Sequence, residues 1–509
     1  MRALVSVSDK TGLVDFVKGL VDLGWEIIAT GGTQKLLESQ GVKTIGISEV
    51  TGFPEILDGR VKTLHPKVHG GILARRDLPA HMETLKENEV ETIDLVCVNL
   101  YPFRQTIAKE GVTLEEAIEN IDIGGPSMVR SAAKNWRDVT IVCDPSDYGT
   151  VLAELREKGS TTPETRLKLS AKAYTHTAEY DACIATYMRK QAGLNEKLFL
   201  EYDLKQPLRY GENPHQSANF YAALEPAPFS LAFATQIQGK ELSYNNIQDA
   251  NAALNVLRDF KEPFCVALKH MNPCGAAVGK TIEEAWQAAY EADKVSIYGG
   301  IVGVNRELTA EVARGMKPIF LEIVIAPSFT PEALEILSAK KNLRVMKVDM
   351  DYDGAPVPQY VGVNGGLLVQ QLDTQVEEVS RDMCVTKVKP TETQMADLNF
   401  GWKIVKHVKS NAICVVRDGH TIGVGAGQTN RVGSAQIALE EAKAAGFTEG
   451  LILSSDGFLP FDDTVALAAQ YGVTAIVQPG GSIRDADAIA KADELGIAML
   501  FTGVRHFKH

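Results

Sequence analysis

The amino-terminal part of the chain repeats one pattern: a short apolar run, a polar turn and a segment with helical apolar spacing. The first run covers residues 3–7, and apolar side chains then recur from Leu13 to Leu20 at i, i+3, i+4 and i+7. This spacing predicts a strand followed by an amphipathic helix. The pattern starts again at residues 26–30. Two more buried-type strands are expected, at residues 93–99 and 139–143. The alternation predicts the α/β fold class, with a parallel sheet.

The length of 509 residues predicts two to four domains. Residues 163–193 form a helical stretch without an internal glycine, and a charged stretch follows Gly193. We therefore expect one domain at residues 1–195 and a second region at 196–509. The second region again alternates apolar runs with helical patterns, at residues 264–268, 319–326, 412–416, 451–453 and 475–477. These runs predict a second α/β region, built as two subdomains.

Composition excludes several classes of protein. The 52 Lys and Arg against 65 Asp and Glu give a net charge of −13, which argues against nucleic acid as a partner. None of the seven cysteines forms a C-x-x-C pair, so neither a zinc ribbon nor a disulfide framework is expected, and a reducing cytoplasm fits best. No stretch of 18 apolar residues occurs, so we expect neither export nor membrane insertion.

Polar turns follow the first two predicted strands. Ser8, Lys10 and Thr11 follow the first strand, and Thr30-Gly31-Gly32-Thr33 follows the second. In parallel α/β sheets such turns lie beyond the carboxyl ends of the strands, where helix N-termini bind anions. The turns therefore predict a phosphate cradle. The alternative is a tight strand-to-helix turn capped by Thr33.

A basic segment at residues 60–71 favours the phosphate interpretation. It carries three fixed cations and two histidines without one acidic residue, and such a run focuses positive potential on a cleft. The alternative is a solvated basic loop. Two further expected strand ends, at residues 99–102 and 122–126, add a tyrosine and an aspartate, and Lys134 follows. Lysines, a tyrosine and an aspartate are an acid–base set that needs neither metal nor cofactor.

The motifs at residues 7–12, 30–33, 59–66, 99–103 and 121–125 resemble the cyclohydrolase half of the bifunctional AICAR transformylase/IMP cyclohydrolase family. The resemblance implies a methylglyoxal-synthase-like domain that closes formyl-AICAR to IMP with loss of water. It implies a catalytic set of Lys62, Tyr101, Asp122 and Lys134, whose acid and base roles the sequence leaves open. The nucleotide-binding residues that it implies are Ser8, Lys10, Thr30, Gly32, Thr33, Arg60, Thr63, Asn99 and Gly124.

Lys269 and His270 follow a buried-type strand in the second region, and a histidine beside a lysine is a candidate base. A structural histidine is the alternative. Pro273-Cys274 resembles a motif of zinc deaminases, but residue 277 is alanine, so the second cysteine is absent and a metal site is disfavoured. A glycine-rich run at 423–428 lacks the last glycine of the dinucleotide fingerprint, because residue 428 is glutamine. An NAD-linked oxidoreductase is therefore disfavoured.

Motifs at residues 208–216, 269–273, 410–412, 425–428, 455–461 and 505–509 look like the transformylase region of the same family. The resemblance implies two cytidine-deaminase-like subdomains without catalytic zinc. It implies 10-formyltetrahydrofolate as co-substrate, AICAR as formyl acceptor, and a homodimer with shared transformylase sites. His270 would take the proton from the AICAR amine, Lys269 would assist the leaving folate nitrogen, and Asn411 would orient the formyl oxygen. Further implied ligand contacts are Arg209, Tyr210, Arg505, Phe507 and His509 for AICAR, and Phe458, Pro460 and Asp463 for folate.

One departure from the family concerns the folate side, where Asp462 stands in place of a basic residue of some relatives and is given no folate contact. The substrates are anionic and the chain is acidic, so binding should depend on ionic strength. A nucleotide-sensing regulator without turnover is the alternative function, and two intact acid–base sets argue against it. No metal is expected to be required, and whether a structural potassium ion sits in the larger domain stays open.

Overall fold

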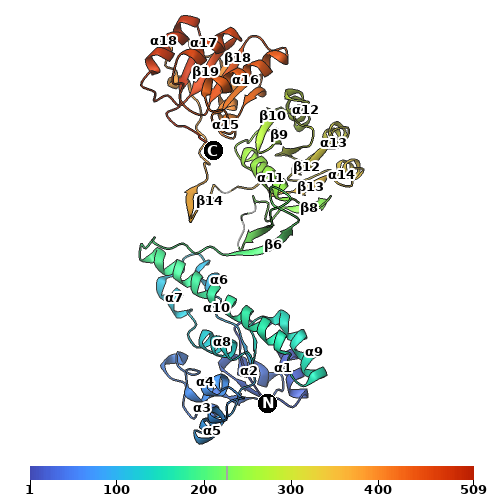
Figure 1. Ribbon diagram of the computed structural model, residues 1–509, viewed down its shortest axis with the longest axis vertical. Helices are drawn as coiled ribbons and strands as arrows, with labels where there is room; N and C mark the ends of the chain where they lie inside the picture. The colour runs from blue at the N-terminus through green and yellow to red at the C-terminus, as the bar shows by residue number, and fades with distance from the viewer. Residues whose placement is uncertain (225–226, 228, 353) are drawn as a thin grey trace. The chain divides into compact units, whose positions relative to one another are not determined.

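A computed structural model describes residues 1–224, 227, 229–352 and 354–509 (Figure 1). The described chain forms two units, residues 1–201 and 202–509. Each unit has its own sheet and its own hydrophobic core.

The first unit is built on a five-stranded sheet in the order β3-β2-β1-β4-β5. All four strand pairs are parallel, which confirms the predicted sheet. The strands are β1 (Arg2–Ser6), β2 (Glu26–Ala29), β3 (Ile45–Gly46), β4 (Leu95–Val98) and β5 (Thr140–Val142). The strand order reverses between β1 and β4, and ligands bind at such a switch point in open α/β sheets. This geometry directs attention to the loops after β1 and β4.

Helices cover the sheet, and one of them is the amphipathic helix predicted after the first strand. Helix α1 (Leu13–Asp22) buries the predicted face, with Leu13, Phe16, Val17 and Leu20 in the core. The long helix α10 (Pro163–Gln191) packs on α8 (Figure 1) and also contacts β5. The other helices are α2 (Gly31–Ser39), α3 (Ile47–Thr51), α4 (Pro66–Leu73), α5 (Pro79–Glu87), α6 (Phe103–Ile107), α7 (Leu114–Glu119), α8 (Gly124–Lys134) and α9 (Tyr148–Lys158). Helix α8 starts at the carboxyl edge of the sheet and carries the predicted glycines 124 and 125.

The second unit has an eleven-stranded sheet in the order β20-β19-β18-β16-β17-β10-β9-β11-β12-β13-β8. Its first half uses α11 (Tyr244–Leu257), β9 (Phe264–Lys269), β10 (Asn272–Val278), α12 (Ile282–Ala292), β11 (Gly300–Val304), α13 (Ala310–Met316), β12 (Leu321–Ala326), α14 (Pro331–Ser338) and β13 (Arg344–Lys347). Its second half uses α15 (Glu392–Val405), β16 (Ile413–Arg417), β17 (His420–Gly425), α16 (Arg431–Ala444), β18 (Leu451–Ser455), α17 (Asp463–Gln470), β19 (Val473–Gln478), α18 (Asp485–Leu495) and β20 (Ala498–Phe501). Strand β8 (Thr235–Gln238) is added at the β13 edge.

The two halves repeat one topology. Each half runs helix, two-stranded hairpin, and then three helix–strand steps, and its hairpin strands occupy corresponding places in the sheet. The antiparallel pair β10 and β17 joins the halves, with Ala277 opposite His420. The α/β region expected here is therefore present in two parts, which share one topology and one continuous sheet.

Alternating side chains on the strands pack into different cores. Phe264, Val266 and Leu268 of β9 enter a core shared by both halves, under α11 and α15. Cys265 and Ala267 enter a separate core under α12, on the other face. The second half has its own core on that other face as well. The unit is thus a three-layer α/β/α structure, as expected for strands buried on both faces.

Two hairpins stand outside these sheets. They are β6 (Tyr202–Leu208) with β7 (Ala218–Ala223), and β14 (Pro358–Val363) with β15 (Gly366–Gln371). Exposed apolar side chains occur on both, including Leu204, Tyr221, Val361, Leu368 and Val369. A two-stranded hairpin is only marginally stable in water by itself. Among the helices of the described residues, none has the length and hydropathy that a membrane span requires.

Candidate functional site

The loops after β1 and β4 meet at the switch point of the first unit. The Asn99 side-chain oxygen accepts hydrogen bonds from the backbone N–H groups of Ser8 (2.6 Å) and Asp9 (3.0 Å). The Asn99 amide nitrogen donates to the Asp9 carbonyl at 3.0 Å. Asn99 is buried, so it holds the first loop in shape from the end of β4. The Lys10 ammonium donates to the Ser8 carbonyl at 3.2 Å in the same loop.

Two buried threonines tie the second loop to the first. The Thr33 hydroxyl accepts from the Val7 N–H and donates to the Val7 carbonyl, both at 3.1 Å. The Thr30 hydroxyl lies 2.6 Å from the Ser6 hydroxyl. Helix α2 begins at Gly31, so its first N–H groups, including that of Gly32, open onto the same edge of the sheet. A helix N-terminus between polar loops is suited to a phosphate group.

The predicted basic segment is less positive than its sequence indicates. Lys62 lies 3.5 Å from the Glu55 carboxylate, and Arg60 forms an ion pair with Glu119. Both acids come from outside residues 60–71, so tertiary structure offsets part of the expected positive charge. The Lys62 ammonium also lies beside Gly31, where a Cβ would be 3.8 Å from the ammonium nitrogen. Lys62 is therefore the cation of the segment that reaches the helix N-terminus.

Asp122 is the partly buried carboxyl group of this site. One of its oxygens accepts the Gly125 N–H at 2.8 Å, and its own N–H donates to the Tyr180 hydroxyl at 2.7 Å. Burial raises the pKa of Asp122, while the Gly125 N–H, Lys62 and the Tyr101 N–H act in the opposite direction. The Tyr101 side chain is exposed at the end of β4. A carboxyl group that holds its proton more firmly than usual is suited to proton transfer.

The remaining candidates of the first unit fall into two groups. Thr63 is buried against the start of α8, where a Cβ on Gly124 would lie 2.5 Å from the Thr63 hydroxyl oxygen. Lys134 is the last residue of α8. At 1.5 Å per residue, Lys134 lies about 15 Å along the helix axis from Gly124, the first residue of α8 after Asp122. The structure therefore brings Lys62, Tyr101, Thr63 and Asp122 together and leaves Lys134 at the other end of the helix.

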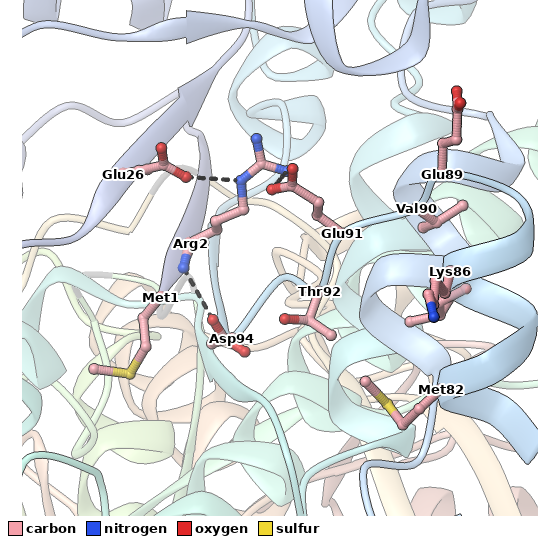
Figure 2. Close-up of a pocket in the computed structure, with 11 residues that line it drawn as sticks. Met1, Arg2, Glu26, Met82, Lys86, Glu89, Val90, Glu91, Thr92 and Asp94 are labelled. Atoms are coloured by element: carbon pink, nitrogen blue, oxygen red, sulfur yellow. Dashed lines mark hydrogen bonds and ion pairs between the residues drawn. The ribbon is translucent and has the colours of Figure 1, made fainter. Parts of the chain in front are cut away.

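A cavity of about 590 Å³ lies at the opposite, amino-terminal edge of the sheet (Figure 2). Met1, Arg2 and Glu26 line it from the starts of β1 and β2, with residues of α5 across from them. The Arg2 guanidinium pairs with Glu26 at 3.0 Å and with Glu91 at 2.9 Å. None of the predicted site residues lines this cavity. Four acidic side chains line it against only Arg2 and Lys86, which does not favour an anionic substrate, so the acid–base chemistry is to be sought at the carboxyl edge.

In the second unit, the hairpin β9–β10 turns at His270 and Met271. Both residues have left-handed backbone angles, with φ of 52° and 62°. Two successive residues of positive φ are typical of a type I′ turn. The His270 side chain is exposed at the tip of this turn. The Lys269 ammonium donates to the Tyr298 carbonyl at 2.8 Å, beside the turn.

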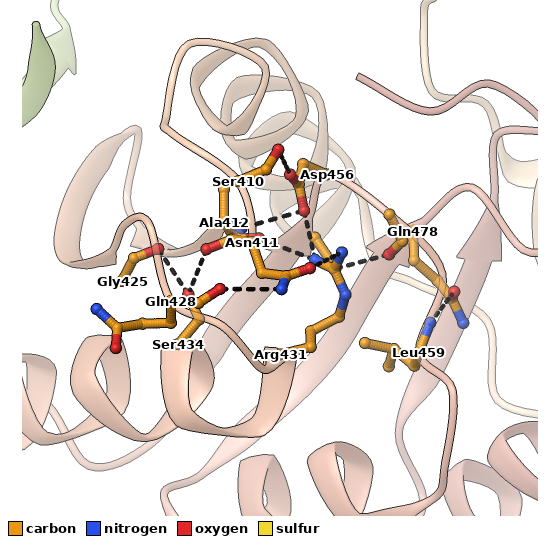
Figure 3. A network of polar contacts seen from close by, with 12 residues as sticks. Ser410, Asn411, Ala412, Gly425, Gln428, Arg431, Ser434, Asp456, Leu459 and Gln478 are labelled. Atoms are coloured by element: carbon orange, nitrogen blue, oxygen red, sulfur yellow. Dashed lines mark hydrogen bonds and ion pairs between the residues drawn. The ribbon is translucent and has the colours of Figure 1, made fainter. Parts of the chain in front are cut away.

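Asn411 belongs to a buried polar network in the second half of the unit (Figure 3). Its side-chain oxygen accepts from the Arg431 guanidinium at 2.7 Å, and its amide nitrogen donates to the Gln428 carbonyl at 2.9 Å. Arg431 forms an ion pair with Asp456, which is fully buried. Asp456 also accepts hydrogen bonds from the Ser410 hydroxyl and from a backbone N–H. Among the described residues, only one of the two amide hydrogens of Asn411 has a hydrogen-bond acceptor.

The carboxyl-terminal tail lies beside this network. Ser410 and Lys508 pair in both directions, through the Ser410 N–H (2.8 Å) and the Lys508 N–H (3.0 Å). The Phe507 ring packs on Gly457, where a Cβ would be only 2.6 Å from the ring. The guanidinium of Arg505 stacks over Phe507 at 4.7 Å, and the His509 ring meets Phe507 edge-on at 5.5 Å. The three tail residues predicted for AICAR are thus one stacked group.

His506, inside the same tail, anchors it to the chain before α15. Its two ring nitrogens lie 2.6 Å from Asp373 and 2.9 Å from Glu377. Burial alone would lower the pKa of His506, but the hydrogen bonds and charges of these two carboxylates raise it. The ring also packs on Trp402 at 5.1 Å. A histidine held between two carboxylates is a fixed, structural contact of the tail.

Contacts across the two halves bring the candidates together. Asn272 donates to the His270 carbonyl at 3.0 Å and accepts from the Lys409 N–H at 2.9 Å, which links the turn to the Ser410–Asn411 segment. The Lys508 ammonium adds a second link, to the Met271 carbonyl at 3.3 Å. The turn that carries His270 is therefore tied directly to the Ser410–Asn411 segment and to the tail.

The other predicted contacts lie on the surrounding loops. Arg209 stacks over Tyr210 at 5.6 Å, just after β6, and among the described residues neither forms a hydrogen bond or ion pair with the tail. Phe458 is exposed in the loop after β18, which also contains Pro460. Asp463 begins α17. The loop is fixed by the Leu459 N–H, which donates to Gln478 at 3.0 Å (Figure 3).

Sequence reasoning missed Asp249 in α11. Its carboxylate accepts the Met271 N–H at 2.8 Å, directly at the turn. A signal was present: Asp249 precedes His270 by 21 residues, and Asp397 precedes Asp418 by the same number. Asp397 accepts the N–H groups of Asp418 and Gly419 in the corresponding hairpin β16–β17. The repeated spacing of an aspartate before a hairpin turn marks both residues.

Comparison with known proteins finds relatives that match this chain along its full length. The family model described as AICARFT/IMPCHase bienzyme matches residues 132–441, and the MGS-like domain model matches residues 12–127. A protein of Bacillus cytotoxicus named "Bifunctional purine biosynthesis protein PurH" is 58% identical over 510 residues, covering 100% of this chain and 99% of the relative. A protein of the same name from Lactobacillus acidophilus is 58% identical over 512 residues, with 100% of both chains covered. A solved structure, "Crystal structure of ForH", is 39% identical over 36% of this chain and 97% of that chain, with a TM-score of 0.33.

Proposed function

The chain belongs to the AICARFT/IMPCHase bienzyme family, and from this premise we propose how its residues divide the two reactions. It is a bifunctional enzyme of purine biosynthesis, which formylates AICAR with a folate co-substrate and closes formyl-AICAR to IMP. We assign the ring closure to residues 1–201 and formyl transfer to residues 202–509. The assignment rests on one observation: each unit holds its own acid–base group set.

In the cyclohydrolase site, the phosphate of formyl-AICAR lies at the N-terminus of α2, next to Ser8 and Lys10. The Lys62 ammonium, beside Gly31 and Asp122, then faces the reacting end of the nucleotide. The carboxamide nitrogen attacks the formyl carbon and loses a proton, and the former formyl oxygen leaves as water after protonation. Asp122, whose pKa burial raises, exchanges protons in this step together with Lys62 and Tyr101.

In the transformylase site, the AICAR amine attacks the formyl carbon of 10-formyltetrahydrofolate. The new N–C bond forms as the bond from carbon to the folate nitrogen breaks. His270 takes the amine proton, Lys269 lies beside it to protonate the leaving nitrogen, and the free amide hydrogen of Asn411 orients the formyl oxygen. The stacked residues Arg505, Phe507 and His509 support AICAR binding next to this group. Neither step calls for a metal ion.

A homodimer is the assembly that we propose for this chain. The hairpins β6–β7 and β14–β15 expose apolar side chains on strands that belong to no larger sheet. A second copy that covers them would bury this apolar surface, which is favourable by about 25 cal/mol per Å². Arg209 and Tyr210 directly follow β6, so they would reach the site of the second copy. We place the reactions in the cytoplasm.

The test is to supply the purified chain with AICAR and 10-formyltetrahydrofolate and to follow the products by chromatography. Wild type should make IMP. Lys62→Ala should accumulate formyl-AICAR, and His270→Ala should leave AICAR unchanged while still closing added formyl-AICAR. If Lys62→Ala closes formyl-AICAR at the wild-type rate, the assignment of Lys62 is wrong. If both variants lose both activities, the division between the units is wrong.

A further inference from the structure

The turn that carries His270 adopts a conformation that its own residues disfavour. Type I′ turns have positive φ at both central positions and favour Asn-Gly or Asp-Gly. Here the two residues are His270 (φ 52°) and Met271 (φ 62°), neither of which is glycine. Left-handed backbone at residues with ordinary side chains persists only where surrounding contacts hold it in place, and it clusters at functional sites. The contacts around Met271 supply that support.

Two charged side chains bind the two polar backbone groups of Met271. The Asp249 carboxylate, from α11, accepts the Met271 N–H at 2.8 Å. The Lys508 ammonium, from the carboxyl-terminal tail, donates to the Met271 carbonyl at 3.3 Å and to the His407 carbonyl at 2.7 Å. The residue next to His270 is therefore held from both sides, by segments far apart in the sequence.

The second half of the unit contains the same turn with a different sequence. Asp397 is the sixth residue of α15, as Asp249 is the sixth of α11. Asp397 accepts the N–H groups of Asp418 (3.0 Å) and Gly419 (2.7 Å). That turn has the favoured Asp-Gly sequence. In the first half, histidine takes the place of Asp418, and the lysine contact is added on the carbonyl side.

The electrostatics around the turn agree with this arrangement. Burial raises the pKa of Asp249, and the Met271 N–H and the nearby His270 act against that rise. Burial lowers the pKa of Lys508 to about 8. The charged side chains nearest the turn are those of Asp249 from α11, Lys269 from β9 and Lys508 from the tail. Lys409 reaches the turn only through its backbone N–H, which donates to Asn272. One carboxylate and two ammonium groups thus lie around the turn that carries the imidazole.

We propose that Asp249 and Lys508 are positioning residues for formyl transfer, which fix the Met271 peptide groups and thereby hold the His270 imidazole at the AICAR amine. The inference rests on the proposed role of His270 as the base. The carboxyl-terminal tail then has two functions: it binds AICAR, and it fixes the turn that carries the base. Nucleotide binding and alignment of the base become one event.

The test compares formyl transfer and ring closure in the same protein samples. Asp249→Ala and Lys508→Met should each lower kcat for AICAR formylation roughly 10- to 100-fold, the cost of a misplacement near 1 Å. Asp249→Asn and Lys508→Arg should recover part of the loss, because each keeps a hydrogen-bonding group. Closure of formyl-AICAR should stay at the wild-type rate. Asp397→Asn, the matched change at the turn without histidine, should lower thermal stability and leave the kcat of formylation near wild type.

Two readouts separate positioning of the base from a general loss of structure. A nearby anion stabilises imidazolium, so Asp249→Asn should move the acidic limb of the kcat/KM profile for formylation to lower pH. In a His270→Ala background, Asp249→Ala should cause no further loss, because both changes act through one group.

Three results would overturn the proposal: wild-type kcat in both Asp249→Ala and Lys508→Met, an unmoved pH limb, or an equal loss with and without His270. A fourth result points elsewhere. If His270→Ala alone formylates AICAR at the wild-type rate, the role of His270 fails, and the positioning proposal fails with it. The single variants therefore distinguish failure of the base assignment from failure of the positioning.

Discussion

Gly125→Ala tests whether the exact place of the Asp122 carboxylate controls ring closure. Gly125 is the second residue of α8, and its N–H binds one Asp122 oxygen at 2.8 Å. A Cβ at this position would lie 2.3 Å from the other Asp122 oxygen and 2.9 Å from a methyl group of Leu100. Real Cβ atoms essentially never come closer than 3.0 Å, so the carboxylate must retreat by at least about 0.7 Å.

A displacement of this size should lower the rate of ring closure roughly 10- to 100-fold, or about 1.4–2.7 kcal/mol in activation free energy. Overpacking should cost about 1–3 kcal/mol of unfolding free energy in the first unit. The assay is formyl-AICAR closure followed spectroscopically, with AICAR formylation and a thermal melt measured on the same sample. The formylation rate should be unchanged.

Gly149→Ala is the matched control, because Gly149 is the second residue of α9 and its Cβ would meet nothing within 4 Å. This change should keep full activity and stabilise the unit by about 0.4–1 kcal/mol. Wild-type closure by Gly125→Ala would refute the reasoning, since the carboxylate cannot stay in place beside the new methyl group. Equal loss in Gly149→Ala would show that the assay reports folding and not the position of Asp122.

Three further outcomes are expected. Arg431→Met should lower the unfolding free energy of the second unit by about 3–5 kcal/mol, because it leaves the Asp456 carboxylate buried without its cation; denaturant titration would show a smaller loss if the pair is dispensable. Because the pKa of His506 is raised in the folded protein, its ion pairs contribute stability that is fully present below the pKa of this histidine in the unfolded chain. This stability is lost as pH rises through the pKa in the folded protein, so the melting temperatures of wild type and His506→Gln should converge toward alkaline pH. Deleting residues 505–509 should abolish formylation and spare ring closure; product analysis that finds both activities equally reduced would indicate misfolding instead.

The repeating apolar pattern was enough to predict the local architecture. Leu13 and Phe16 are buried as their spacing required, and helix α10 covers the expected helical stretch. These features depend on neighbours within a few residues, so the sequence carries them directly. The α/β class follows from the alternation itself. The sequence did not predict that one sheet runs through both halves of the second unit, because the pairing of β10 with β17 has no signature in the sequence of either strand.

Contacts between distant segments limited what could be predicted of the sites. The basic segment contains no acidic residue, and yet Glu55 and Glu119 lie against its cations. Lys134 follows Asp122 closely in sequence, but helix geometry separates them. Asp249 is one of many helical aspartates until the fold sets it under a hairpin turn. Each of these outcomes depends on where chain segments meet, which single-sequence patterns do not report.

The seam in the middle of the large sheet has a mechanical consequence. Within the part of the chain that the structure describes, only Ala277 and His420 are paired in register between β10 and β17. Hydrogen bonds of the Ala276 N–H to the Thr421 hydroxyl and of the Val278 N–H to the Gly419 carbonyl complete the line between the halves. His270 belongs to one side of this line and Asn411 to the other. The spacing between His270 and Asn411 therefore depends on how firmly this seam is held. A ligand that contacts both halves restrains their relative motion. Hydrogen exchange at the Val278 amide, which donates a hydrogen bond across the seam, should therefore slow when AICAR binds.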